Sequence, residues 1–378
     1  MTPQNNPKIL YLAYDLSDAG IEKRTTMLAD GGARVRLAGF HRTKEPVASV
    51  AGCPTVNFGQ TFNGGFAQRL WSVLKLCVSR KYKACFADAD ILLARNLEML
   101  AIAVSCRRFS AKKPVIVYEC LDIHRFLLGR GPVSMALRAL EGWLMTKTSA
   151  ILTSSPSFIS EYFNPRYAGK LPIRLVENKV YPTPATSANA PRPAGPPWKI
   201  GWFGIIRCRK SLDILTQLVR MSQGQVEVII RGRPALDQFE DFHKTASSTP
   251  GLKFLGPYKS TDLAEHYREV HFSWAIDMFE EGLNSAWLLP NRLYEGGLSA
   301  TVPIAMKNVE TGRTIDRMGI GLSVPSLSAD WLHSYFPQLT ADQYRTLETQ
   351  VQSLPFSTWS FNRQDCTDLV AWLEALRG

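Results

Sequence analysis

The segment from Pro290 to Leu298 holds the residues whose types and spacing are best suited to binding chemistry. Proline and asparagine favour the start of a helix, and the short apolar stretch that follows, residues 301–306, is typical of a buried strand. In such a helix Asn291 and Glu295 are four residues apart and share one face. The helix start offers N–H groups and a partial positive charge to phosphate oxygens, and a carboxylate accepts hydrogen bonds from both hydroxyls of a ribose. The pattern indicates a nucleoside diphosphate site, although a helix merely capped by its asparagine fits this segment alone equally well.

Cations follow a second segment, which is rich in glycine. Gly201-Trp202-Phe203-Gly204 is expected to end a strand, and the next turn contains Arg207, Arg209 and Lys210. Glycine lets the backbone approach a ligand, and cations just beyond a strand end neutralise a diphosphate. Arg231 closes the next expected strand in the same way, and it either adds charge to this pocket or faces solvent. The two segments together predict half of a nucleotide site.

Carboxylates in the first half of the chain are candidates for a general base. Asp15 and Asp18 follow the first expected strand, and Asp122 follows the strand expected to begin at Val115. A carboxylate at a strand end can deprotonate an attacking hydroxyl. Asp122 is the first choice for this role and Asp15 the second. The alternative is that either residue caps the following helix, and His124 is a further candidate base.

Composition describes a globular protein with two domains. The length of 378 residues exceeds what one ordinary core requires. The hydrophobic fraction of 45% and the charged fraction of 20% are typical of a globular protein. The net charge of +11 suggests phosphorylated ligands, an anionic membrane surface or nucleic acid as partners, and the scattered basic residues make nucleic acid the weakest of the three. The seven cysteines suggest neither a metal site nor a disulfide framework. With no secretory signal or spanning helix expected, the prediction is a cytoplasmic protein.

Strands and helices alternate along both halves of the sequence, which is typical of doubly wound parallel sheets. We predict a first domain over residues 1–181, a linker rich in Pro and Ala over 182–197, and a second domain over 198–355. Residues 356–378 are expected to form a helix that crosses back to the first domain. In the first half, strands are expected over 8–14, 34–40, 87–92, 114–120 and 150–154, with an amphipathic helix over 133–148. In the second half, strands are expected over 198–203, 226–231, 252–255 and 271–276.

The order of these elements resembles the nucleotide-sugar-dependent glycosyltransferases of the GT-B fold, close to family 4. The motifs that carry the resemblance are Gly204 followed six residues later by Lys210, and Pro290 to Glu295 running into Val302-Pro303-Ile304. The residues Tyr14 to Asp18 and Gly39 to Arg42 are further similar to bacterial exopolysaccharide transferases of the succinoglycan type. The resemblance extends over nearly the whole chain. It implies an α/β GT-B fold in which two Rossmann-like doubly wound domains face a central cleft.

The resemblance also implies roles for the site residues. Lys210 and Glu295 would hold the diphosphate and ribose of the sugar donor, and the full set assigned to donor binding is Gly204, Arg207, Arg209, Lys210, Arg231, Asn291, Arg292 and Glu295. Trp287 stands where the Glu-x7-Glu motif of the family begins, Ile205 replaces its usual Arg, and Leu121 stands where a His is expected beside Asp122. Retention of anomeric configuration and inversion, with Asp122 or Asp15 as base, both stay open.

The expected function is therefore transfer of a hexose from a nucleoside diphosphate sugar, with a UDP-sugar expected as donor substrate and no metal or other cofactor. The acceptor is a glycan or a polyprenyl-diphosphate-linked oligosaccharide of bacterial surface or exopolysaccharide synthesis. The basic surface and the helix over 133–148 suggest peripheral contact with an anionic membrane at the inner face of the plasma membrane. Two alternatives are a sugar-nucleotide epimerase of the same fold and a non-catalytic protein that binds nucleotide sugars.

Overall fold

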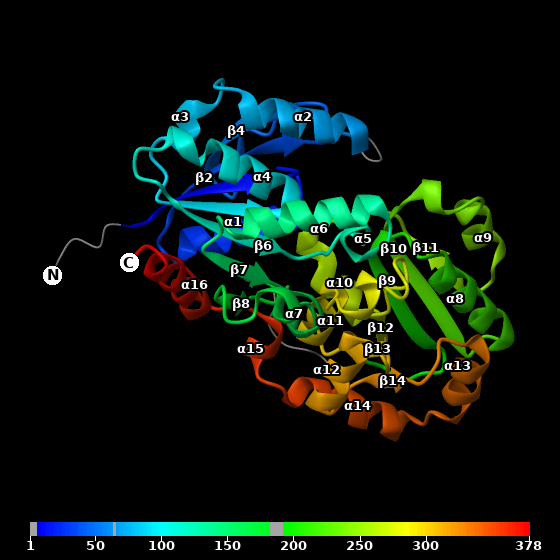
Figure 1. Ribbon diagram of the computed structural model, residues 1–378. Helices are drawn as coiled ribbons and strands as arrows, with labels where there is room; N and C mark the ends of the chain where they lie inside the picture. The colour runs from blue at the N-terminus through cyan, green and yellow to red at the C-terminus, as the bar shows by residue number, and fades with distance from the viewer. Residues whose placement is uncertain (1–5, 63–65, 182–191) are drawn as a thin grey trace. The chain divides into compact units, whose positions relative to one another are not determined.

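The computed structural model describes residues 6–62, 66–181 and 192–378, and the chain forms two compact units (Figure 1). The first unit contains Met1–Val176 together with Asn362–Gly378, and the second contains Glu177–Phe361. The chain therefore passes from the first unit to the second and back again. Most of the expected linker, residues 182–191, lies outside the described residues, whereas residues 192–197 belong to the second unit.

The first unit is built on an eight-stranded sheet whose strands lie in the order β3-β4-β2-β1-β5-β6-β7-β8. All neighbouring strands are parallel except the edge pair of β3 and β4. The strands are β1 (Lys8–Ala13), β2 (Arg34–His41), β3 (Ser49–Val50), β4 (Cys53–Gln60), β5 (Ile91–Arg95), β6 (Val115–Cys120), β7 (Ala150–Thr153) and β8 (Ile173–Leu175). Interior strands are buried on both faces, which is why their sequences read as continuous apolar runs.

Helices cover both faces of this sheet. They are α1 (Ala19–Asp30), α2 (Phe66–Val78), α3 (Lys83–Phe86), α4 (Asn96–Cys106), α5 (Arg125–Leu128), α6 (Pro132–Met145), α7 (Asn164–Tyr167) and α16 (Arg363–Ala375). Right-handed crossovers that run in opposite directions along the sheet place α1 and α4 on opposite faces. Helix α4 packs on β5 and β6 and contacts both α2 and α6, whereas α1 packs against α16.

One expectation for the first unit was wrong in detail. The strand expected from residue 87 begins at Ile91, because Asp88 and Asp90 pair with lysines instead of continuing the apolar run. Asp90 also accepts a hydrogen bond from the backbone N–H of Lys8, at 3.0 Å. The sequence reasoning also did not assign β4 or α2, which lie between the second expected strand and β5. No helix in the described part of the chain is long and apolar enough to span a membrane.

The second unit is built on a six-stranded parallel sheet in the order β11-β10-β9-β12-β13-β14. Its strands are β9 (Trp198–Ile206), β10 (Val226–Pro234), β11 (Leu252–Phe254), β12 (Phe272–Trp274), β13 (Val302–Met306) and β14 (Leu322–Val324). Its helices are α8 (Arg209–Met221), α9 (Phe242–Ser248), α10 (Leu263–Arg268), α11 (Asn291–Leu298), α12 (Glu310–Met318), α13 (Ala329–Tyr335), α14 (Ala341–Ser353) and α15 (Phe356–Trp359). Two parallel α/β units of this kind are the fold class that the sequence predicts.

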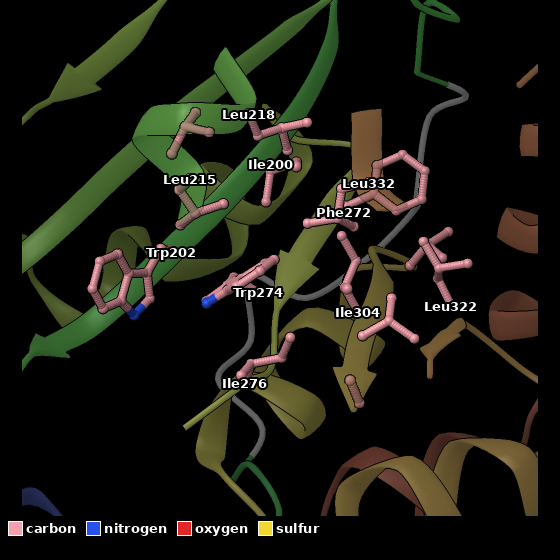
Figure 2. Close-up of a cluster of buried hydrophobic side chains, with 14 of the residues drawn as sticks. Ile200, Trp202, Leu215, Leu218, Phe272, Trp274, Ile276, Ile304, Leu322 and Leu332 are labelled. Carbon is pink, nitrogen blue, oxygen red and sulfur yellow. The ribbon is translucent and has the colours of Figure 1, made fainter. Parts of the chain in front are cut away.

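The core of the second unit lies between the central strands and α8. Alternate residues of β9 and β12 point to one face, among them Ile200, Trp202 and Trp274, which are all almost completely buried (Figure 2). Leu215 and Leu218 of α8 pack toward Ile200 in the same cluster. This packing fixes β9 and β12 side by side, and with them the loops that follow both strands.

Strands β9 and β10 continue past the residues at which they were expected to end. Gly204 has φ +108° and is paired in register with Gly232, which has φ +137°. Such angles are strained for residues with a Cβ, and a Cβ on Gly232 would overlap the carbonyl oxygen of Gly204. Because both residues are glycine, the strands stay paired as far as Ile206 and Pro234, and Arg231 lies inside β10 rather than at its end.

Candidate donor site in the second unit

The site predicted from the sequence lies at the carboxyl ends of β9 and β12. The strand order reverses between these two strands, because β10 and β11 extend the sheet on one side of β9 and β12, β13 and β14 extend it on the other. In open parallel sheets a ligand binds outside the carboxyl ends of the strands at such a point. Arg207 and the start of α8 follow β9, and the segment from Asp277 to Glu281 follows β12.

Arg207 is held in place by this segment. Its Nη2 lies 3.4 Å from Oδ2 of Asp277, and its guanidinium lies 4.6 Å from the ring centroid of Phe279. The other oxygen of Asp277 accepts hydrogen bonds from the backbone N–H of Phe279, at 3.0 Å, and from Oγ of Ser285, at 3.2 Å. Burial opposes ionisation of Asp277, but Arg207 and Arg292 outweigh it, and the pKa of this carboxyl stays below its ordinary value. Asp277 is therefore a fixed negative charge that orients Arg207.

Lys210 is paired with the same segment through Glu281. Both side chains are about half exposed, at 58% and 47%, so this ion pair faces solvent. Asp277 and Glu281 were not singled out from the sequence, and they lie 70 and 71 residues beyond their partners. No local pattern links residues so far apart, and only the adjacency of β9 and β12 brings them together.

Helix α11 begins at Asn291, with Pro290 at the N-cap position. The ring of Pro290 has no hydrogen-bond acceptor, so the cap residue cannot satisfy the first N–H groups through its side chain. The helix dipole adds a partial positive charge at the same end. Arg292 donates from Nη2 to the carbonyl oxygen of Ile276, at 3.1 Å, and thereby ties the start of α11 to the residues after β12.

Glu295 lies one turn inside α11, as the spacing predicts, and is partly buried. Its Oε2 accepts a hydrogen bond from the hydroxyl of Tyr267, at 3.3 Å. Burial, and then the negative charge of Glu295, raise the pKa of Tyr258 and of Tyr267. Both rings also pack against Phe203 of β9, with centroids 6.3 and 4.8 Å away. Glu295 therefore adjoins an aromatic cluster whose two phenols stay neutral.

The remaining candidate cations have other partners. Arg209 pairs with Asp213 of its own helix, at 3.8 Å, and Arg231 pairs with Glu269 beyond α10, at 3.0 Å. The structure thus brings Arg207, Lys210 and Arg292 to the acidic segment after β12, while Arg209 and Arg231 meet carboxylates elsewhere. Within the described ranges, no three His, Cys, Asp or Glu side chains are grouped as metal ligands require.

The candidate bases of the first unit have distinct environments. Asp15 is buried, and its Oδ1 accepts from the N–H and the Oγ of Ser17, at 3.0 and 2.6 Å, while Arg42 lies 3.5 Å from its other oxygen. Asp122 is exposed and follows the end of β6. His124 caps α5 by accepting from the N–H of Phe126, at 3.3 Å, and burial lowers its pKa.

A buried ionic network in the first unit was also missed by sequence reasoning. Glu119 of β6 accepts from Nε of Arg24, at 2.6 Å, and from Nε of Arg95, at 2.8 Å. Burial raises the pKa of Glu119, but the two guanidinium groups outweigh it and hold the pKa at about 2. Arg95 also lies 3.6 Å from Asp18, which caps α1 by accepting from the N–H of Gly20. The network thus fixes the loop between β1 and α1.

Solved structures with the same architecture cover almost the whole chain. HepE of Anabaena, solved in complex with UDP, has a TM-score of 0.69 at 15% identity and covers 97% of this chain and 99% of its own. WaaG, a glycosyltransferase involved in lipopolysaccharide biosynthesis, has a TM-score of 0.64 at 11% identity and covers 96% and 99%. No family model matches the chain. The fold is that of the GT-B glycosyltransferases, as the sequence motifs predicted.

A relative with much higher identity defines the family more narrowly. The succinoglycan biosynthesis protein ExoL of Rhizobium meliloti (strain 1021) is 44% identical over 378 residues, which cover 98% of this chain and 94% of the relative. The chain belongs to the ExoL family.

Proposed function

We propose that the chain is a glycosyltransferase that moves a hexose from a nucleoside diphosphate sugar to an acceptor hydroxyl in exopolysaccharide synthesis. The observation that carries the proposal is the arrangement at the carboxyl ends of β9 and β12, where Arg207, Lys210 and Arg292 of α11 all contact the segment after β12. The name of the ExoL relative supports the biosynthetic setting, and the UDP complex of HepE supports a UDP-sugar as donor.

Three positive groups would meet the diphosphate as it leaves. When the bond between the sugar and the diphosphate breaks, negative charge grows on the departing phosphate oxygen. Arg207 is already oriented by Asp277, so it can stabilise that charge without a reorganisation of its side chain. Lys210 and the N–H groups at the start of α11 add to this stabilisation. Glu295, one turn along the helix, would accept hydrogen bonds from the ribose hydroxyls.

We propose that the acceptor is a glycan or a lipid-linked oligosaccharide and that it binds to the first unit. Among the candidate bases, Asp122 is exposed, whereas Asp15 is buried. An exposed carboxylate is better placed to receive a proton from an incoming hydroxyl. Asp122 is therefore the preferred base for an inverting reaction.

Calorimetry with UDP and a hydrolysis screen across nucleotide sugars test the proposal. Glu295→Ala is expected to weaken UDP binding at least tenfold, because it removes a charged acceptor from the ribose, worth about 1.5–3 kcal/mol. Glu227→Ala is the matched control, since Glu227 lies near the amino end of β10 and pairs with Lys253. The screen should show slow release of one nucleoside diphosphate by the unaltered chain. Unchanged UDP affinity in Glu295→Ala would refute the assignment of the site.

A further inference from the structure

The outward face of α2 is apolar. Leu70, Trp71, Leu74 and Val78 are all exposed, with Trp71 at 70% and Val78 at 76%. Residues three and four apart share a helix face, so these side chains form one stripe along the helix. A helix on the surface of a protein normally turns its polar residues to water. Here a stripe of apolar side chains faces away from the unit, with Gln68 and Lys75 exposed beside it.

Helix α6 has the same property. Val133, Met135, Leu140 and Trp143 are exposed, at 60%, 63%, 40% and 54%. The sequence predicted this amphipathic helix, but it gave no sign of a second helix of the same kind. Together α2 and α6 present two exposed tryptophans and six exposed aliphatic side chains on one unit. Exposed apolar side chains that gather on a helix face in this way mark a site of interaction.

The exposure does not come from loose packing. On its inner side α2 buries Val73 and Leu76, and α6 buries Leu144 and Met145. Both helices contact α4, which lies on the sheet, so they belong to the same helical layer (Figure 1). The two apolar faces are therefore held by the fold on one side of the first unit.

The exposed charges on and just beyond these helices are positive. Helix α2 contains no acidic residue, and exposed Lys75, Arg80 and Lys81 lie in its last turn and just beyond it. The sequence of α6 contains one carboxylate, Glu141. That group is buried, and burial raises its pKa, so it contributes little negative charge to the surface.

We propose that α2 and α6 form a docking surface for an anionic lipid bilayer. Exposed indole rings and aliphatic side chains enter the boundary between headgroups and acyl chains, and flanking lysines and arginines bind anionic headgroups. A second copy of the chain fits less well, because its matching face would bring cations of like sign together. The surface lies in the first unit, so it acts independently of the donor site in the second.

Co-sedimentation with vesicles tests the surface. The unaltered chain is expected to bind phosphatidylcholine vesicles that contain phosphatidylglycerol, and to bind pure phosphatidylcholine vesicles and high-salt samples more weakly. The double variant Trp71→Glu with Leu74→Glu is expected to lower the partition coefficient at least tenfold. Leu236→Glu is the matched control, because Leu236 is 55% exposed but belongs to the second unit. Equal binding by the double variant and the control would overturn the proposal.

A second measurement separates a bilayer from other occupants. Vesicles with brominated acyl chains quench tryptophans that enter the bilayer, so Trp71→Phe and Trp143→Phe should each reduce the quenched fraction of fluorescence, and Trp331→Phe should not. The proposal would be refuted if both Trp→Phe variants were quenched as strongly as the unaltered chain. It would also be refuted if light scattering showed a dimer that Trp71→Glu converts to a monomer. UDP affinity, measured on the same samples, should be unchanged in every surface variant. If the unaltered chain did not bind UDP, that result would contradict the donor site alone and not the docking surface.

Discussion

Removing the carboxylate of Glu281 should strengthen the binding of UDP. Glu281 pairs with Lys210, so a diphosphate must displace this carboxylate before it can use the lysine. Glu281→Gln keeps the size of the side chain and removes its charge. The variant leaves Lys210 without its ion-pair partner and also takes one negative charge away from the incoming phosphates.

The size of the effect follows from the exposure of the pair. Both side chains are about half exposed, and exposed ion pairs are worth about 0.2–1 kcal/mol. Loss of that competition corresponds to UDP affinity about one and a half to five times higher, since about 1.4 kcal/mol is a factor of ten. Because salt screens exposed charges, the gain should shrink as the ionic strength rises.

Isothermal titration calorimetry with UDP at low and high salt measures this gain. Glu227→Gln is the control, because it breaks an ion pair with Lys253 near the opposite end of the sheet and should leave UDP affinity unchanged. The double variant Lys210→Gln with Glu281→Gln should gain less over Lys210→Gln alone than Glu281→Gln gains over the unaltered chain, because only the repulsion of the phosphates is then relieved. An unchanged or lower UDP affinity in Glu281→Gln at low salt would show that Lys210 does not receive the diphosphate.

Two further predictions concern stability, measured by urea denaturation. Glu119→Gln should lower the free energy of unfolding by about 3–5 kcal/mol, because it leaves buried guanidinium groups uncompensated, while Glu98→Gln at a partly exposed pair should cost less than about 1 kcal/mol. Since the folded-state pKa of Glu119 is below its unfolded value, this stabilisation is present above about pH 4.5 and is lost as the pH falls toward 2. If Glu119→Gln left the pH dependence of the free energy of unfolding unchanged in this range, the prediction would be contradicted. Gly232→Ala should lower the free energy of unfolding by about 2–4 kcal/mol, because of its positive φ and the overlap of the new Cβ with Gly204. Gly224→Ala, which also has positive φ but open space around it, should lower it by about 1 kcal/mol. Equal losses in the two variants would contradict the role of the overlap.

The sequence predicts those parts of the fold that local pattern controls. Apolar runs such as β6 and β9 are buried on both faces, and the spacing of Asn291 and Glu295 places both on α11 as expected. The end of β9 was placed too early, because Gly204 suggests a break when considered alone. Its pairing with Gly232 lies in the tertiary structure, and that pairing carries the strand onward.

The partners of the site residues were beyond prediction for the same reason. Arg207 and Lys210 could be recognised as cations after a strand, but Asp277 and Glu281 approach them only because β12 lies beside β9. Likewise Glu119 meets Arg24 across 95 residues of chain. Charge pairs of this kind depend on strand order, which the local sequence does not encode.

The return of residues 362–378 to the first unit affects how the protein is made. Helix α16 packs against α1, where Gly31 leaves room for the backbone of Cys366, and Arg174 donates to the carbonyl oxygen of Asp368 at 3.0 Å. These residues leave the ribosome only after the entire second unit has been synthesised. The unit that begins to fold first therefore cannot finish first, and until α16 arrives the surface of α1 that it covers is open to solvent and to chaperones.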